Sequence, residues 1–467
     1  MTKFSAARNE TLAYVANENG DLEAVNTANG AIVWSDALGV PLHATPSVVG
    51  THLWIGTAVS GRMIRVNSDT GAVQCRVSLG TGIDFASPVI AKPPGGVTTL
   101  YVGVQDNGAV QGPMMAISDA TCKVEWKRNP YRVFSGSWSP DAYGVNAKGI
   151  PLVIFGSGDP DCAIYALNAR TGATLWRVKS LVGGLADFGT GAAISPPGRN
   201  GFAHGMAYVP GKDRILYAID LTTGALKWHF NYGAATGANF AGGRSTAALA
   251  GRSVVFGTPV GVAAVDAITG KKIWLSEDAG PSDTEVLSSP LVTGPAGHQV
   301  VVYGDLKGYI EVSSLATGQV LYKYKTGGYV ISSPADSAGN LLIGSSDGFL
   351  YDLAPGGSNG TLPTTSITAP AAGSVIANPG AKPVTAAGTA QPGSAAPVTT
   401  VNVAVQMNGP AGQWWNAAKR TWQPGPAWNH ATLSGSGGTI NWTLGVPVPA
   451  QGSVLTFSAR AVRRWPG

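Results

Sequence analysis

The sequence predicts an all-β protein, in which an eight-bladed β-propeller is followed by an immunoglobulin-like β-sandwich. The propeller is predicted by a turn motif, Asp/Asn-x-x-Thr-Gly with an aromatic residue four positions later, that recurs along most of the chain. Its turn positions are 41 to 52 residues apart, a period typical of four-stranded blades. A change of pattern after residue 353 predicts the second domain. The turn positions are Gly30, Gly71, Cys122, Gly172, Gly224, Gly270 and Gly318.

The stretch from Leu216 to Trp228 is the clearest copy of the repeat. Tyr217 and Ile219 alternate on one face, as in a strand. Thr223-Gly224 makes a tight turn, where glycine accepts a positive φ, and the chain returns as a second strand that carries Trp228. Each copy therefore predicts the third and fourth strands of a blade.

Two more strands precede each copy. One is rich in β-branched and aromatic residues, and eight such runs predict eight blades. Before it lies a short strand with a recurring Ser/Thr-Pro pair, as at Thr45-Pro46 and Ser87-Pro88, and proline suits a first or edge strand. The eighth blade lacks the turn with its aromatic strand, and residues 1–10 are short for completing it. We therefore expect the natural chain to begin further upstream.

Composition and charge limit the class of protein. The chain has 467 residues, of which 44% are apolar and 12% are charged, so it is not a disordered polymer. It has no apolar run near the roughly 20 residues that cross a bilayer. No signal peptide is visible at the N-terminus. We expect a monomer that binds no nucleic acid.

Residues 354–365 form a linker by composition, and residues 366–467 contain short alternating runs at the spacing of an immunoglobulin-like sandwich. We expect the last strand of this domain to be cut at the C-terminus. The domain has six Lys or Arg and no Asp or Glu, so its charge is +6, whereas the repeats carry −1. This bias is either simple composition or a surface for acidic polymers.

The second domain also holds six of the thirteen tryptophans. Trp442 alternates within a strand and is expected in the core. The others either cover a small core or stack on sugars and acidic wall polymers beside Lys419 and Arg420. The candidates for polymer binding are Trp414, Trp415, Trp422 and Trp428.

The repeats resemble those of the pyrroloquinoline quinone (PQQ) dehydrogenase-like propeller superfamily, which holds quinoprotein dehydrogenases and non-enzymatic relatives. The resemblance covers residues 10–353, and the tail is similar to bacterial immunoglobulin-like modules. It implies that the aromatic residue of each blade packs against the turn glycine of the next blade. These docking residues are Trp34, Trp126, Trp176, Trp228, Trp274 and Tyr322.

Two departures from the repeat occur at a pair of positions expected to form a tryptophan–glycine docking contact. Cys75 replaces the tryptophan of the second blade, and Cys122 replaces the glycine of the third. We predict a Cys75–Cys122 disulfide in place of the packing; the alternative is two buried free thiols. Cys162 is left unpaired. A disulfide places the protein outside the reducing cytoplasm, secreted, periplasmic or on the cell surface.

The resemblance also indicates where a ligand would bind, in a funnel at the mouth of the central channel. Candidate funnel residues are His43, Asp84, Trp138, Asp187, Arg244 and Glu285. In a quinoprotein they would hold PQQ and calcium and supply a carboxylate base. However, the adjacent Cys-Cys pair, the long insertions of those enzymes and a haem-attachment motif are absent from the sequence.

Metal sites have weak support. Asp159 and Asp161 are the candidates for a calcium loop, and the six histidines have no zinc spacing. We therefore predict an extracytoplasmic, non-catalytic binding or scaffold protein with no cofactor, whose partner is a protein or a cell-wall or carbohydrate surface. The alternative is a PQQ- and calcium-dependent dehydrogenase of an alcohol, a polymeric alcohol or a sugar.

Overall fold

The computed structural model describes residues 1–467 apart from 60, 109, 183–185, 237–244, 278–284, 338, 354–363, 372–373, 375–382, 392–397, 409–411, 424–427, 436–438, 448–452 and 464–467. The chain divides into two compact units, residues 1–353 and 354–467. Each unit is described by itself.

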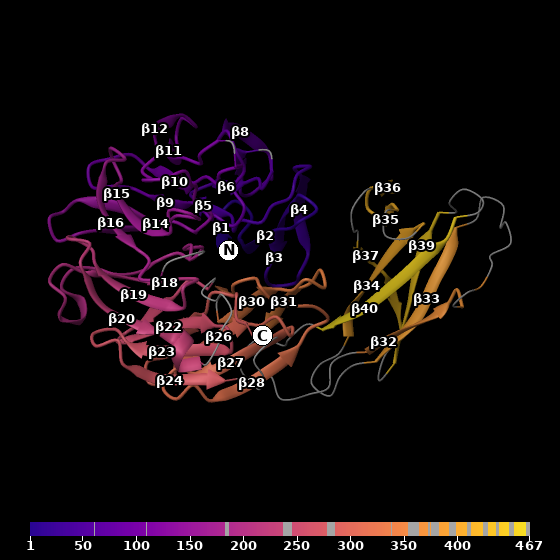
Figure 1. Ribbon diagram of the computed structural model, residues 1–467. Helices are drawn as coiled ribbons and strands as arrows, with labels where there is room; N and C mark the ends of the chain where they lie inside the picture. Colours follow the sequence, from indigo (N-terminus) through magenta and orange to yellow (C-terminus); the bar gives the residue numbers. More distant parts are fainter. Residues whose placement is uncertain are drawn as a thin grey trace. The chain divides into compact units, whose positions relative to one another are not determined.

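The first unit is a ring of eight antiparallel sheets, each built from consecutive strands (Figure 1). The predicted propeller fold is confirmed. The first four blades are β1 (Thr2–Ser5), β2 (Glu10–Ala16), β3 (Asp21–Asn26) and β4 (Ile32–Ala37); β5 (Ser47–Val49), β6 (His52–Gly56), β7 (Arg62–Asn67) and β8 (Val73–Ser78); β9 (Val89–Ala91), β10 (Thr99–Gly103), β11 (Met114–Ser118) and β12 (Val124–Arg128); and β13 (Ala142–Val145), β14 (Pro151–Gly156), β15 (Ala163–Asn168) and β16 (Thr174–Lys179).

The other four blades continue the ring. They are β17 (Ala193–Ser195), β18 (Met206–Pro210), β19 (Ile215–Asp220) and β20 (Leu226–Asn231); β21 (Ala248–Ala250), β22 (Ser253–Thr258), β23 (Gly261–Asp266) and β24 (Lys272–Glu277); β25 (Leu291–Thr293), β26 (Val300–Gly304), β27 (Tyr309–Ser314) and β28 (Val320–Lys325); and β29 (Ala335–Ser337), β30 (Asn340–Gly344) and β31 (Leu350–Leu353). In the part of the chain that the structure describes, two short helices, η1 (Arg199–Gly201) and α1 (Tyr232–Thr236), interrupt the strands. Within the described residues no helix is long and apolar enough to span a bilayer.

The recurring turn motif is a hydrogen-bonded cap on the third strand. In the fifth blade the Asp220 carboxylate accepts the backbone N–H groups of Thr222 and Thr223, at 3.0 and 2.9 Å. The Gly224 N–H donates back to the Asp220 carbonyl at 2.9 Å. Gly224 has φ 73°, which explains why glycine occupies this position. Asn67 and Asp266 cap their turns in the same way.

The tryptophans dock between blades as the resemblance implied. A Cβ built on Gly224 would lie only 2.6 Å from the Cβ of Trp176 in the preceding blade. The Trp176 indole N–H donates to the Leu221 carbonyl at 3.0 Å. Equivalent glycine contacts and indole hydrogen bonds join the following pairs: Trp34 with Gly71, Trp126 with Gly172, Trp228 with Gly270, and Trp274 with Gly318. Tyr322 is 38% exposed, and the turn that would follow it falls in residues 354–363, outside the described part.

The junction between the second and third blades is covalent. Cys75 and Cys122 form the predicted disulfide, with Cα atoms 6.6 Å apart. Cys122 has φ 58°, in the left-handed region that glycine occupies at the equivalent turns. It keeps the turn's hydrogen bond, from its N–H to the Ser118 carbonyl at 2.9 Å. The cysteine pair therefore replaces the aromatic contact without changing the turn.

A second repeated link lies on the side of the ring that we call the mouth face. This face carries the turns between the second and third strands of each blade and the connections from one blade to the next. In six connections of the described chain, one residue accepts an N–H from the turn of the following blade. The next residue donates its N–H to the turn of the preceding blade, and these bonds are 2.9 to 3.3 Å long. These junction dipeptides are Pro41-Leu42, Gly82-Ile83, Gly136-Ser137, Asp187-Phe188, Glu285-Val286 and Tyr329-Val330.

The Ser/Thr-Pro pairs have a different role from the one expected. The proline precedes the inner strand, as Pro46 precedes β5 and Pro88 precedes β9, so it is not a strand residue. The hydroxyl of one blade instead accepts the backbone N–H at the corresponding position of its neighbour. Ser87 accepts from Thr45 at 2.9 Å, and Ser333 accepts from Ser289 at 3.0 Å.

The ring closes between β1 and β29. The Thr2 hydroxyl donates to the Asp336 carbonyl at 3.0 Å. The N-terminal residues thus form the inner strand of the first blade, whereas the eighth sheet contains three strands within the described residues.

The second unit contains two antiparallel sheets around one core. One sheet has β32 (Thr364–Ala369), β33 (Val384–Gln391), β39 (Ile440–Val446) and β38 (Thr432–Ser434). The other has β36 (Thr421–Gln423), β35 (Trp414–Asn416), β34 (Val398–Met407), β37 (Trp428–His430) and, paired with β34, β40 (Leu455–Arg463). The core combines Ala386 of β33, Val403 of β34 and Trp442 of β39, all fully buried. The prediction that Trp442 is a core residue is confirmed.

Gly224→Ala tests the docking contact. The added methyl group meets Trp176 and the residue keeps a positive φ, so the free energy of unfolding should fall by about 2–5 kcal/mol. The matched control is Gly251→Ala, since Gly251 has φ 59° and open space around a Cβ. It should cost about 1–2 kcal/mol. Equal losses in urea denaturation would show that the tryptophan contact contributes nothing.

Replacing both Cys75 and Cys122 by serine should lower the free energy of unfolding by about 2–4 kcal/mol, because the cross-link no longer restricts the unfolded chain. Cys75→Trp with Cys122→Gly should recover much of this loss by restoring the docking pair. Urea denaturation with and without reductant measures both. If reductant lowers the free energy of unfolding of the Trp/Gly variant as much as that of the native chain, the predicted role of the disulfide is wrong.

Asp220 should make stability depend on acid pH. Burial opposes ionisation of its carboxyl, but hydrogen bonds from Thr223, His204 and Lys227 outweigh burial and lower its pKa to about 2. The unfolded chain has a pKa near 3.9, so the stabilisation is complete above pH 4 and disappears as the pH falls to about 2. Asp220→Asn should therefore lose roughly 2 kcal/mol at pH 7. The difference from wild type should vanish near pH 2. Glu18→Gln, at an exposed position, is the control.

Candidate functional site

A pocket of about 280 Å³ opens on the mouth face at the junctions of the second to fifth blades. It brings together Asp84, Trp138, Asp159 and Asp187 from the predicted candidates. All of them belong to turns or blade connections that the junction dipeptides hold in place. Its full lining is Asp84, Gln105, Asp106, Trp138, Gly158, Asp159 and Asp187.

Two basic side chains contact two of the four carboxylates of this pocket. The His43 Nδ1 lies 2.5 Å from the Asp84 carboxylate, and Lys212 Nζ lies 2.8 Å from that of Asp187. Lys212 also sits over the Trp138 ring, 4.1 Å from its centroid. The sequence indicated His43 but not Lys212, because Lys212 lies in the next blade, 25 residues beyond Asp187.

An aromatic row leads from His43 to Trp138 of the pocket lining. Phe85 stacks on the His43 ring with centroids 5.5 Å apart, and the Trp138 ring centroid is 6.4 Å from that of Phe85. Phe85 is 45% exposed. The pocket therefore combines an acidic floor with a partly exposed aromatic edge, a combination suited to an apolar segment that carries a cation.

Another funnel candidate, Glu285, is not part of the described lining of this pocket. Glu285 is the first residue of a junction dipeptide between the sixth and seventh blades, where its carbonyl accepts the Leu306 N–H at 3.3 Å. Arg244 lies outside the described residues. Of the six candidates, Asp84, Trp138 and Asp187 line one pocket, His43 pairs with Asp84, and Glu285 lies at another junction.

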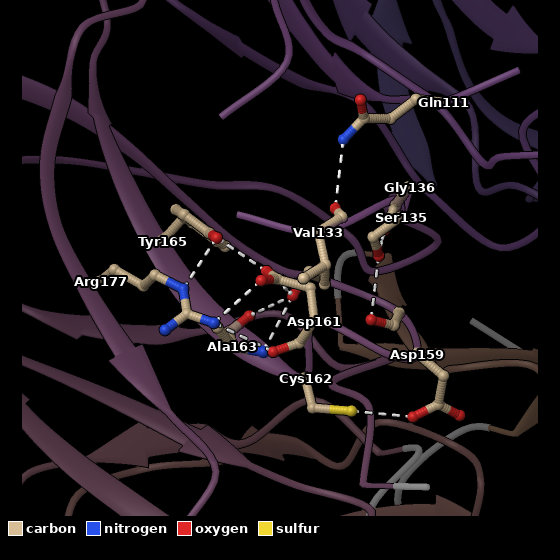
Figure 2. A network of polar contacts seen from close by, with 12 residues as sticks. Gln111, Val133, Ser135, Gly136, Asp159, Asp161, Cys162, Ala163, Tyr165 and Arg177 are labelled. Carbon is tan, nitrogen blue, oxygen red and sulfur yellow. Dashed lines mark hydrogen bonds and ion pairs between the residues drawn. The ribbon is translucent and has the colours of Figure 1, made fainter. Parts of the chain in front are cut away.

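The two aspartates predicted as calcium ligands, Asp159 and Asp161, contact different groups (Figure 2). The Asp161 carboxylate is 2.8 Å from Arg177 Nη2 and accepts hydrogen bonds from Ser157 and Tyr165, at 2.8 and 2.7 Å. The Asp159 carboxylate points instead toward Cys162. The Asp161 carboxylate therefore already has three protein partners. No group of three or more potential metal ligands occurs among the described residues.

Cys162 takes no part in the disulfide, as predicted. Its thiol donates to the Asp159 carboxylate at 2.8 Å. Burial, reinforced by Asp159, raises its pKa to about 12. The thiol therefore stays protonated at neutral pH and is a poor nucleophile.

Several other acidic residues of the mouth are structural. Asp213 and Asp347 each accept a hydrogen bond from the tyrosine four positions later, Tyr217 and Tyr351. Asp305 accepts the Tyr309 backbone N–H at 2.7 Å. The Asp-x-x-x-Tyr spacing, visible in the sequence, is the signal that could have indicated the contacts of Asp213 and Asp347.

PQQ does not fit the described pocket. The quinone needs Arg, Ser and Thr donors for its carboxylates, whereas this pocket presents four aspartates and its lysine already pairs with one of them. Anions would be repelled and cations attracted.

The tail tryptophans separate into different environments. Trp415 is 7% exposed and belongs to the core, and Trp422 packs on it with ring centroids 5.6 Å apart. Trp414 is half-buried, and Trp428 lies in β37. Trp415 and Trp422 also line a second pocket, of about 560 Å³, with Pro383, Ala417, Arg420, Gly445 and Pro447.

Comparison with known proteins identifies the repeats. The PQQ_2 family, described as outer membrane protein assembly factor BamB, matches residues 2–132 and 153–357. The chain belongs to this family. The match confirms the resemblance to PQQ-like repeats and does not extend into most of the second unit.

Individual relatives agree with the family. Outer membrane protein assembly factor BamB of Burkholderia pseudomallei (strain K96243) is 25% identical over 352 residues, 73% of this chain and 81% of the relative. The Yersinia pestis protein of the same name is 28% identical over 188 residues, 39% of this chain and 44% of the relative. These relatives favour the scaffold prediction over the dehydrogenase alternative.

Solved structures of two kinds share the fold. BamB from Moraxella catarrhalis has a TM-score of 0.54 and 20% identity, covering 75% of this chain and 92% of its own. Quinohemoprotein alcohol dehydrogenase from Comamonas testosteroni has a TM-score of 0.56 and 15% identity, covering 71% of this chain and 69% of its own. At these identities the likeness shows the propeller fold alone.

Proposed function

We propose that this protein is a non-catalytic scaffold in the assembly of outer membrane proteins, which holds a protein partner on the mouth face of its propeller. The observation that carries the proposal is a set of exposed apolar side chains on the mouth face, in the blades that also form the acidic pocket. We call this set the apolar rim. All of them lie in turns or connections of the second to fifth blades. They are Val59, Phe85, Val110, Val133, Phe134, Leu181 and Val182, with exposed fractions of 42 to 75%.

The chemistry of this surface defines the partner segment. Apolar rim residues favour burial against an apolar partner, whereas the aspartates favour a Lys or Arg in the pocket. The junction dipeptides fix the backbone of the loops, so the surface is pre-formed and loses little entropy on binding. An extended or loop segment with apolar side chains beside a basic residue satisfies both features.

The cellular compartment is inferred from the disulfide and from the relatives. The Cys75–Cys122 disulfide supports a compartment outside the reducing cytoplasm. The relatives are named as outer membrane protein assembly factors, and we extend this location to the present chain. The proposal needs no cofactor.

Photo-crosslinking tests the partner surface. Benzoylphenylalanine introduced at Phe85 or Leu181 should cross-link to an outer membrane assembly protein in the native cell envelope. Leu321, 56% exposed on β28 of the seventh blade, is the matched control and should give no such product. Cross-linking equally from Leu321, or to no assembly protein from either mouth position, would contradict the proposal.

The dehydrogenase alternative has a direct test on the same sample. Titration with PQQ and Ca²⁺ should give no binding heat, because the described pocket is acidic. Micromolar binding accompanied by dye-linked alcohol oxidation would overturn the scaffold assignment.

A further inference from the structure

The second unit contains a pocket that the scaffold role does not use. It lies in the sheet of β34 to β37 and at the ends of β33 and β39, and its volume of about 560 Å³ is within the usual range of ligand sites. Its walls are largely apolar, with two tryptophans, two prolines and Ala417. Among the described residues of its lining, Arg420 is the charged one.

A hairpin holds the two rings and the arginine in place. Trp415 of β35 and Trp422 of β36 are directly paired across the strands. The Asn416 side chain accepts the Lys419 N–H at 2.9 Å and donates to the Gln423 side chain at 3.0 Å. Asn429 accepts the Ala417 N–H at 2.7 Å, which ties the turn to β37. The pocket wall is therefore pre-formed.

The positive charge of this unit is not balanced by any carboxylate side chain within the unit. Residues 354–467 include no Asp or Glu, so no carboxylate side chain of the unit can pair with Arg420. Arg420 itself is exposed. A guanidinium binds a carboxylate through two parallel hydrogen bonds, so an uncompensated arginine at the edge of an aromatic pocket favours an anionic ligand.

We propose that this pocket binds a segment of an acidic polysaccharide, with a sugar ring against Trp422 and a sugar carboxylate on Arg420. The C–H face of a sugar ring is apolar and packs on an indole, while its polar edges stay in water. The net charge of +6 over the unit complements a polymer of such sugars. The disulfide of the propeller favours a compartment where carbohydrates, not nucleic acids, are the abundant polyanions.

Calorimetric titration of the full chain with polygalacturonate tests the site. Neutral dextran and a single-stranded oligodeoxynucleotide of equal charge are the comparison ligands. Polygalacturonate should bind, and both comparison ligands should bind at least about tenfold more weakly. Failure of polygalacturonate to bind, or equal binding of either comparison ligand, would overturn the proposal.

Matched variants locate the site. Arg420→Gln should weaken polygalacturonate binding about tenfold or more, because it removes a charge-assisted pair. Lys419→Gln removes the same charge from the neighbouring exposed residue outside the pocket lining and should change binding less than about threefold. Both residues are exposed, and thermal unfolding checks that the fold is kept. Equal losses in the two variants would indicate diffuse attraction and contradict the pocket assignment.

Discussion

The contact between neighbouring blades is the interaction on which the propeller depends. An isolated four-stranded sheet has two apolar faces and cannot bury either by itself. Here each blade buries them against its neighbours, as when Leu12 and Tyr14 of the first blade share a core with Leu53 of the second. Tryptophan docking on glycine, Ser/Thr hydroxyl bonds and the junction dipeptides repeat around the ring. Because the links are redundant, one docking pair has been replaced by a disulfide without loss of the turn geometry.

The same links decide what the mouth face can do. Backbone groups of the connections form hydrogen bonds between blades. The Asp161 carboxylate pairs with Arg177, and the Asp213 carboxylate accepts a hydrogen bond from a tyrosine. What stays available is a small acidic pocket with an apolar rim. Such a surface suits the recognition of another protein, whereas hydride chemistry on an anionic quinone would need donors that the described pocket does not present.

The two units have opposite electrostatic characters and different pockets. The propeller repeats carry a net charge of −1 and an acidic pocket, whereas the second unit carries +6 and a pocket edged by Arg420. The two proposals therefore concern ligands of different charge, and each can fail without the other. A chain with both properties would hold a protein partner while contacting an acidic polymer of the envelope.

The sequence by itself determined the repeat, the turn glycines, the docking tryptophans and the Cys75–Cys122 pair. Each of these is imposed by a local rule or by the blade period, so it is visible as spacing. Only the tertiary structure decided that Lys212 meets Asp187 and Trp138, that Asp161 pairs with Arg177, and that Ser87 binds the N–H of Thr45. These partners lie 16 to 74 residues apart or in different blades. Spacing does not encode the direction in which a loop side chain points, because loop backbones lack the fixed period of a strand.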